Sequence, residues 1–386
     1  MSGKRTVQEG SSCIMANKME LRQINRNIVY RCIYNHDMIS RQEIAAETEL
    51  SIPTVLQYLA ELEDKKLIRT EGAFESTGGR RAKMIRCVYD AAYAVGIDIT
   101  KNHLTILIVD LKGRIRWGGE REAFPFEDTD VYYDEVCSRL EKLIASNRIP
   151  KKKIIGVGIS LPSIVDKDND HVTYGHILNE PSDIIRCFAG RLPFKVCIFN
   201  DANSGGYAET WDNESDKLRF YLMLSNSVGG AMIINNEIYH GDNSRSGEIG
   251  HTKIVPNGKK CYCGQQGCVN AYLSAKILSD PCAGLLEEFF EKLESGDESC
   301  RQLFDTYLEH LAITVVNLRM LYDCQIILGG YVGKHMDRYM EDLGRRLIKN
   351  NPYEDGFEYV QACRYKTEAS AVGGALPFIT QFIEQI

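Results

Sequence analysis

The sequence predicts an α/β protein in which an N-terminal winged helix-turn-helix precedes a body of two related α/β lobes. Three observations support this prediction: two capped helix patterns followed by a β-hairpin, a succession of strands and turns that occurs twice, and one loop dense in metal-ligand residue types. At 386 residues the chain also exceeds what one hydrophobic core usually organises. We expect a head over residues 1–88, a first lobe over 89–198, and a second lobe with the ligand-rich loop over 199–386.

The composition is that of a soluble globular protein, with 44% apolar and 26% charged residues. No apolar run is long enough to span a membrane, and residues 1–17 lack the apolar core of a signal peptide. The thirteen cysteines are an odd number and are scattered through apolar segments, which favours reduced, buried thiols. We therefore expect a cytoplasmic protein with no membrane association.

The net charge of −7 is unevenly distributed along the chain. Residues 1–86 contain 14 Lys and Arg against 11 Asp and Glu, an excess of +3. The remainder contains 32 Lys and Arg against 42 Asp and Glu, a net charge of −10. A basic head on an acidic body is typical of a DNA-binding segment attached to another kind of domain.

Two short helices are predicted in the head from their capping residues. Ser40 and Glu43 form a capping box, so a first helix is expected to end near Thr48. After a tight turn, Ser51 is suited to cap a second helix that has Pro53 in its first turn. This spacing is typical of a helix-turn-helix, although an ordinary αα-hairpin would have the same pattern.

The second helix has one apolar face and one polar face. The apolar face repeats at i, i+4 and i+7, through Val55, Leu59 and Leu62. The side chains expected to point outward, toward a DNA major groove, are Thr54, Gln57, Tyr58 and Glu61.

Residues 67–70 and 83–88 are predicted strands joined by a hairpin with a basic tip at Gly78, Gly79, Arg80 and Arg81. Arginines carried on glycines can approach a phosphate backbone or enter a narrow minor groove. We therefore expect DNA binding, and the candidate contact residues are Arg41, Thr54, Gln57, Tyr58, Arg80 and Arg81.

The body is predicted from a repeated pattern of apolar strands and turns. The first copy comprises residues 95–99, 104–109 and 115–117, and the second comprises 220–224, 229–234 and 238–239. Each copy is followed by a segment whose pattern predicts a helix. In such two-lobed architecture a ligand lies in the cleft between the lobes, at the carboxyl ends of strands.

Four metal-ligand side chains lie close together in the sequence: His251, Cys261, Cys263 and Cys268. A Cys₃His set matches one tetrahedral zinc ion and leaves no open coordination position, so the site is expected to be structural. Gly264 and Gly267 let the chain curl around one point. The alternative, simple buried thiols, is disfavoured by the polar setting of residues 258–266.

These motifs together resemble the ROK family of bacterial sugar-responsive repressors and sugar kinases. The resemblance is carried by the run from Gly247 to His251, by the cysteine loop and by residues 200–203. The head, from Ser40 and Arg41 to the glycine-arginine hairpin, resembles the winged helix-turn-helix of the repressor branch. The family resemblance implies a two-lobed actin-like (ribonuclease H-like) ATPase fold with a sugar pocket beside the zinc loop.

The resemblance also implies which residues contact a sugar, at Asn200, Asp201, Glu248, His251 and Asn270. Asn270 stands where the family has a glutamate, and Asp201 resembles the base that deprotonates the attacking hydroxyl in the kinases. The alternative for Asp201 and Asn203 is that they only end a strand and cap a helix.

The phosphate-binding motifs of the family kinases are degraded in this chain. Residues 98–101 read Asp-Ile-Thr-Lys where the family has a glycine-rich turn, and residues 225–227 read Ser-Asn-Ser where it has Gly-Thr-Gly. Ser163 follows Pro162 at a position where glycine is usual, whereas the pair Gly329-Gly330 is retained. Side chains in these turns obstruct a triphosphate, so we expect that the chain is not an enzyme.

The sequence thus predicts a DNA-binding transcriptional regulator, a repressor, that senses a sugar or sugar phosphate and acts as a homodimer or homotetramer on a double-stranded operator. One alternative is an active sugar kinase with Asp201 as base and magnesium-ATP as phosphoryl donor. Another is a regulator that answers to a partner protein and binds no small ligand.

Overall fold

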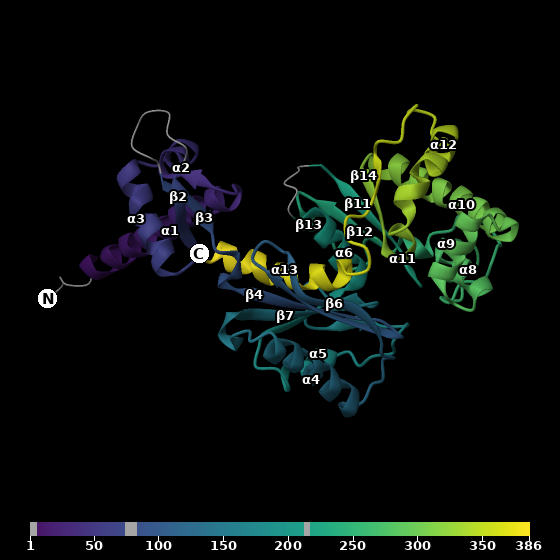
Figure 1. Cartoon of the computed structure of the whole chain (residues 1–386), viewed down its shortest axis with the longest axis horizontal. Coiled ribbons are helices and arrows are strands. Elements are labelled where there is room, and N and C mark those ends of the chain that lie inside the picture. The colour runs from purple at the N-terminus through teal and green to yellow at the C-terminus, as the bar shows by residue number, and fades with distance from the viewer. Residues whose placement is uncertain (1–5, 74–82, 212–216) are drawn as a thin grey trace.

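The computed structural model describes residues 6–73, 83–211 and 217–386. It contains a helical head and two α/β lobes joined by a long C-terminal helix (Figure 1).

The head consists of helices and a small antiparallel sheet with strand order β1-β3-β2. Its elements are α1 (Thr6–Tyr34), β1 (Ile39–Ser40), α2 (Arg41–Thr48), α3 (Ile52–Asp64), β2 (Ile68–Ala73) and β3 (Lys83–Cys87). Both halves of the predicted capping box are present, because the Ser40 hydroxyl accepts from the Glu43 N–H and the Glu43 carboxylate accepts from the Ser40 N–H. Ser51 caps α3, and Glu49 makes the turn with φ of 57°. Both predicted helices and the wing strands are therefore confirmed.

The expectation that Tyr58 points outward is wrong. Tyr58 is only 5% exposed and packs in the core of the head. The apolar face of α3 is wider than the sequence analysis assumed, because Tyr58 lies beside Val55, Leu59 and Leu62 at i, i+3, i+4 and i+7. Gln57 remains exposed on the opposite face.

The first lobe is built on a five-stranded sheet of order β10-β7-β4-β5-β6. Strands β4, β5 and β6 form an antiparallel meander, and β7 and β10 lie parallel to β4. The elements are η1 (Tyr89–Ala91), β4 (Tyr93–Ile99), β5 (His103–Asp110), β6 (Ile115–Ala123), α4 (Asp130–Ser146), η2 (Lys151–Lys153), β7 (Ile154–Leu161), β8 (Ile164–Val165), β9 (Val172–Tyr174), α5 (Ile184–Ala189) and β10 (Val196–Asn200).

The second lobe repeats this topology in the sheet β13-β12-β11-β14-β15, again a meander followed by two parallel strands. The predicted duplication is thus confirmed in strand order. The elements are α6 (Asp201–Thr210), β11 (Arg219–Leu224), β12 (Val228–Ile234), β13 (Glu237–Ile238), η3 (Ile249–His251), α7 (Asn270–Leu273), α8 (Lys276–Ser279), η4 (Asp280–Cys282), α9 (Leu286–Ser295), α10 (Glu298–Tyr322), β14 (Gln325–Gly329), α11 (Gly330–Gly333), η5 (Met336–Tyr339), α12 (Met340–Asn350), β15 (Val360–Ala362) and α13 (Ala369–Glu384).

The last helix does not stay with the second lobe, in which the sequence analysis placed residues 199–386. Helix α13 packs against β4 and β7 of the first sheet and against α6. The contacts are too close for side chains, because a Cβ at Gly158 would overlap the carbonyl oxygen of Gly374 and one at Gly373 would overlap that of Ser204. These glycines let α13 lie directly on the sheet and on α6.

The same helix carries the head. The chain ends beside the head (Figure 1), where the Asn27 side chain donates a hydrogen bond to the Ile383 carbonyl and the Arg26 guanidinium donates to that of Ile386. The Tyr34 hydroxyl also donates to the Leu111 carbonyl at 2.8 Å. One hydrophobic core runs through head, first lobe and α13, so their relative placement is set by packing.

Within the described ranges, no helix combines the length and apolarity needed to cross a membrane. The cysteines from Cys32 to Cys363 are all free thiols.

Candidate functional site

The four predicted metal-ligand side chains come together in one cluster. His251 ends the short helix η3, and the cysteines lie in the loop before α7. The ligand atoms of His251, Cys261, Cys263 and Cys268 all lie within 4.8 Å of one another. The Cys263 and Cys268 sulfurs are 3.8 Å apart, and the Cys261 sulfur lies 3.9 Å from His251 Nδ1. A tetrahedron with bonds of about 2.3 Å has edges of roughly 3.8 Å, so this donor set fits a zinc-sized ion.

The loop around the cluster is shaped by glycine and braced by one aromatic side chain. Gly264 and Gly267 have φ of 85° and 80°, a region that disfavours side chains. His251 turns Nδ1 toward the sulfurs, and its Nε2 lies 3.2 Å from the Tyr262 hydroxyl. A partner on the second ring nitrogen fixes the orientation of a histidine that faces a metal.

A cavity of about 320 Å³, which we call the cleft, lies between the lobes beside this cluster. Four of the predicted sugar-contacting residues line it: Asn200, Asp201, Glu248 and His251. Its volume is at the lower end of the range of about 300–1,000 Å³ typical of small-molecule sites. The cleft therefore has room for a ligand of monosaccharide size.

Asn200 and Asp201 are held at the start of α6. Asn200 caps the helix by accepting from the Asn203 N–H at 2.9 Å, and its amide donates to the Ser163 carbonyl at 3.1 Å. The cap is thus Asn200, and neither Asp201 nor Asn203 fills that position. The carboxylate of Asp201 is left to border the cleft.

The acidic groups in the cleft and beside it are electrostatically coupled. Burial raises the pKa of Asp201 well above its ordinary value, and the neighbouring carboxylates of Asp98 and Glu248 raise it further. Burial also raises the pKa of Asp98 to about 7, and its Oδ1 has no hydrogen-bond partner within the described part of the chain. Such a site favours a ligand that both donates and accepts hydrogen bonds, as sugar hydroxyls do.

Asn270 does not lie where the family resemblance implies. It is 7% exposed and is absent from the lining of the cleft among the residues that the structure describes. Its amide oxygen instead accepts a hydrogen bond from the Val228 N–H at 2.8 Å. Asn270 therefore supports a strand that borders the cleft, and its assignment as a ligand contact is corrected to a structural one.

Four further side chains line the cleft that the sequence analysis missed: Tyr174, His176, Arg245 and Tyr262. The His176 ring stacks between Tyr174 and Tyr262, with centroid distances of 6.1 Å and 5.8 Å. This stack joins the first lobe to the cysteine loop of the second. Sequence spacing could not reveal it, because Tyr174 and Tyr262 come from segments far apart in the chain.

The phosphate side of the cleft is nearly closed. Its cavity has a volume of only about 70 Å³ and is bordered by Asp98, Thr100, Ser225, Ser227 and Asp201. This volume is far below the range of about 300–1,000 Å³ for ligand pockets. This arrangement agrees with the prediction that side chains in these turns obstruct the binding of a triphosphate.

The candidate DNA-binding face lies on the head. Arg41 and Gln57 are exposed, and Thr54 is half-buried with its hydroxyl 2.8 Å from that of Ser51. Gln57 donates to the Glu61 carboxylate at 3.2 Å. Glu61 itself also pairs with Arg22 and Arg26 of α1, so it braces two helices. The wing arginines Arg80 and Arg81 lie outside the described residues.

Comparison with known proteins supports both parts of the chain. A profile of the ROK family matches residues 94–380, and one described as winged helix-turn-helix DNA-binding matches residues 21–69. The xylose repressor of Caldicellulosiruptor bescii is 25% identical over 362 residues, which cover 88% of this chain and 90% of that protein. The DNA-binding transcriptional dual regulator NagC of Escherichia coli is 24% identical over 344 residues, 84% of each chain.

A solved structure described as a ROK family transcriptional regulator, homologous to the E. coli MLC protein, has the same fold. The TM-score is 0.72 at 19% identity, over 95% of this chain and 97% of that one. The family profile itself spans well over half of the chain, across both lobes and the cysteine loop. The chain therefore belongs to the ROK family and carries an N-terminal winged helix-turn-helix.

Proposed function

We propose that this chain is a DNA-binding transcriptional repressor whose operator binding is controlled by a sugar or sugar phosphate in the cleft. One observation carries the proposal: a helix-turn-helix is packed onto a body whose sugar-sized cleft of about 320 Å³ adjoins a phosphate cavity of only about 70 Å³. Such a body can hold a sugar without room for a phosphoryl donor. Relatives named xylose repressor and NagC support the same function.

The head reads the operator with the exposed face of α3. Gln57 and Thr54 meet base edges in the major groove, and Arg41 at the start of α2 contacts phosphate. Arg80 and Arg81 of the wing anchor the head to the backbone or the minor groove. The head acts as a pair in a homodimer or homotetramer, because paired heads read two half-sites.

Zinc is the metal that we propose for the Cys₃His cluster. His251, Cys261, Cys263 and Cys268 hold it with four protein ligands, so its role is structural. It ties the cysteine loop to η3 and thereby positions His251 and Tyr262 at the wall of the cleft. The ion takes no part in any reaction.

The effector is a sugar or sugar phosphate held through its hydroxyls. Asp201, Glu248 and Asn200 offer hydrogen-bond acceptors and donors along one side of the cleft. Arg245 adds a cation that suits the phosphate of a sugar phosphate. Because relatives are named for xylose and N-acetylglucosamine, these two sugars and their phosphate esters are the first probes to try.

Effector binding changes operator affinity only through its different affinity for two arrangements of the body. Both lobes contribute to the cleft, through Tyr174 and His176 on one side and Glu248 on the other. A ligand that draws them together also moves α6, which packs on α13, and α13 carries the head. Packed elements therefore connect the effector site to the DNA-binding head without a break.

The test is fluorescence anisotropy with labelled genomic fragments from around the protein's own gene. We expect tighter binding to one fragment than to random DNA, and release of that fragment when an effective sugar is added. Glu248→Gln is expected to abolish release without weakening DNA binding, whereas Glu358→Gln, on the surface outside the cleft, is the matched control. Equal affinity for all DNA fragments would refute sequence-specific DNA binding by the head. Specific binding that no sugar changes would instead favour control by a partner protein.

A further inference from the structure

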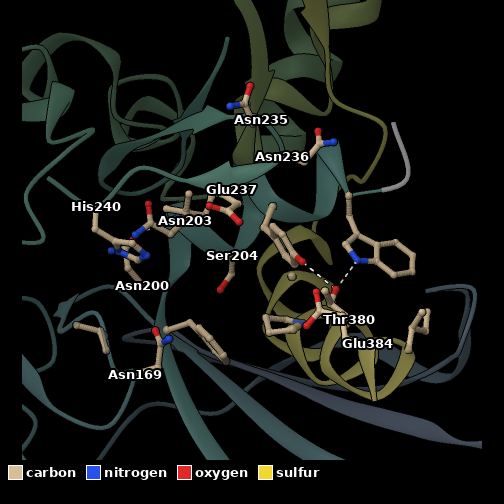
Figure 2. Close-up of a pocket in the computed structure, with 18 of the residues that line it drawn as sticks. Asn169, Asn200, Asn203, Ser204, Asn235, Asn236, Glu237, His240, Thr380 and Glu384 are labelled. Carbon is tan, nitrogen blue, oxygen red and sulfur yellow. Dashed lines mark hydrogen bonds between the residues drawn. The ribbon is translucent and has the colours of Figure 1, made fainter. Parts of the chain in front are cut away.

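A second and larger cavity, which we call the junction cavity, lies where the head, both lobes and α13 meet (Figure 2). Its volume is about 700 Å³, more than twice that of the cleft. The end of α1 contributes Tyr34, α6 contributes Asn203 and Tyr207, the turn before β13 contributes Asn235, and α13 contributes Thr380. A cavity of this volume lies within the range of about 300–1,000 Å³ for small-molecule sites.

One wall of the junction cavity is polar, and Glu237 is its one charged side chain among the described residues. It presents the side-chain amides of Asn169, Asn203 and Asn235 together with the imidazole of His240 (Figure 2). The Nδ1 atom of His240 is buried and has no hydrogen-bond partner in the part of the chain that the structure describes. Burial lowers the pKa of His240, which favours the neutral ring. Amides and a neutral imidazole both donate and accept, as a hydroxyl-rich ligand requires.

The facing wall is aromatic and held in place. The Tyr207 hydroxyl and the Trp211 Nε1 each lie 2.9 Å from the Thr380 hydroxyl, as the dashed lines in Figure 2 mark. Their polar atoms are thus already bonded to α13, and the rings offer the cavity rigid apolar surface. Such a surface packs against the C–H face of a sugar ring at little cost in side-chain entropy.

The charges of the cavity disfavour an ionic ligand. Arg31 is the one cationic side chain among the described residues of the lining, and its guanidinium lies 4.0 Å from the Glu384 carboxylate. The other carboxylate of the lining, Glu237, is exposed. A phosphate would therefore meet acidic groups and only one cation, which already has a carboxylate partner.

We propose that the junction cavity is a second small-molecule site, separate from the cleft, that binds an uncharged saccharide of about two sugar rings. The amide wall bonds its hydroxyls, His240 Nδ1 takes one of them, and the Tyr207 and Trp211 rings pack on its apolar face. This goes beyond the proposed function, which uses the cleft alone. Asn200 borders both cavities and caps α6 between them. Binding in one cavity therefore changes the ligand affinity of the other.

The chain provides its own reporter for this site, because it has only two tryptophans, Trp117 and Trp211. Trp117 packs on Tyr93 in the first lobe, away from the junction cavity, so Trp117→Phe leaves Trp211 as the single tryptophan. We would titrate this variant with cellobiose, maltose and xylobiose, and with glucose 6-phosphate as the charged comparison. We expect a saturable change in Trp211 emission with at least one neutral disaccharide and none with glucose 6-phosphate.

Variants in the same background separate the junction cavity from the cleft. His240→Leu and Asn203→Leu are each expected to weaken the Trp211 response at least tenfold, and Asn243→Ala, an exposed residue outside the cavity, to leave it unchanged. Asp201→Ala, which removes a hydrogen-bonding side chain from the cleft, is expected to keep the response. Thermal unfolding checks that each variant is folded.

Two outcomes would overturn the proposal. One is the absence of a saturable response to every disaccharide of the panel. The other is a response that Asp201→Ala removes and His240→Leu retains, because the signal would then report the cleft. Neither outcome bears on whether the cleft controls DNA binding, so this proposal can fail while the proposed function stands.

Discussion

The amide oxygen of Asn270 accepts a hydrogen bond from the backbone N–H of Val228 at 2.8 Å, and this bond ties the first turn of α7 to the start of β12. Both residues are buried, so water cannot replace the acceptor. The bond therefore holds β12, which borders the cleft, in place next to the cysteine loop.

Replacing Asn270 is therefore expected to reduce stability more than ligand affinity. Asn270→Ala leaves the buried Val228 N–H unsatisfied, which costs about 1–3 kcal/mol of the free energy of unfolding. The measurement is denaturant unfolding, with the exposed Asn243→Ala as control, together with calorimetric titration of the effector. Unchanged stability with abolished sugar binding would return Asn270 to the role of a ligand contact.

Zinc removal is expected to unfold the cysteine loop. Elemental analysis should find about one zinc per chain, because the cluster offers one set of four ligands. Cys263→Ser should lower the free energy of unfolding by roughly 3 kcal/mol or more and weaken sugar binding through His251 and Tyr262. Cys187→Ser, in α5 and outside the cluster, is the control. Metal-free protein of full stability would contradict the assignment.

The buried carboxyl of Asp98 makes stability depend on pH. Burial raises its pKa from 3.8 to about 7, so the native state keeps a proton that the unfolded chain releases. Its contribution to stability is therefore present in acid and is lost as the pH rises through this window. Asp98→Asn removes the part of the dependence that is due to this carboxyl, and each unit of pKa shift corresponds to about 1.4 kcal/mol.

This expectation is checked by urea unfolding of Asp98→Asn and wild type at about pH 5 and about pH 8. The variant should gain stability relative to wild type as the pH rises, and the exposed Asp168→Asn should not. A gap between variant and wild type that stays constant with pH would argue against a raised pKa.

Two neighbouring residues of α3 are expected to have opposite phenotypes. Gln57→Ala should weaken binding to the specific operator by about 1–3 kcal/mol and leave nonspecific binding nearly unchanged, because its exposed side chain meets base edges. Tyr58→Ala should instead destabilise the head by roughly 3 kcal/mol, because it opens a cavity in the core. Anisotropy and thermal unfolding of both variants separate these effects. A Gln57→Ala variant that loses all DNA binding equally would speak against base reading.

ATP-dependent sugar phosphorylation is expected to be absent. A positioned base at Asp201 cannot act without a positioned phosphoryl group, and the adjoining cavity of about 70 Å³ is bordered by the side chains of Thr100, Ser225 and Ser227 in place of a glycine cradle. A coupled assay with a panel of hexoses, pentoses and amino sugars measures this directly, with a family kinase as positive control. Turnover on the order of 1 per second would make the chain an enzyme.

Local patterns in the sequence were enough to predict several parts of the structure. The caps at Ser40 and Ser51, the two strand successions and the clustering of cysteines around Gly264 and Gly267 were all predicted, because each depends on residues close together in the chain. Capping, period-2 strands and short metal loops are short-range interactions, so they can be recognised without knowing how distant segments pack.

Distant packing decided the rest. Tyr58 is buried because the head closes over a wider face of α3, and Asn270 faces Val228 because α7 folds onto β12. The return of α13 to the first sheet depends on close approaches at glycines such as Gly158. Contacts of this kind join residues far apart in the chain, and they form only when whole faces of helices and sheets are complementary in shape. The sequence therefore determined which elements and ligand types this protein has, and only the tertiary structure decided which side chains face the cleft, the junction cavity and the core.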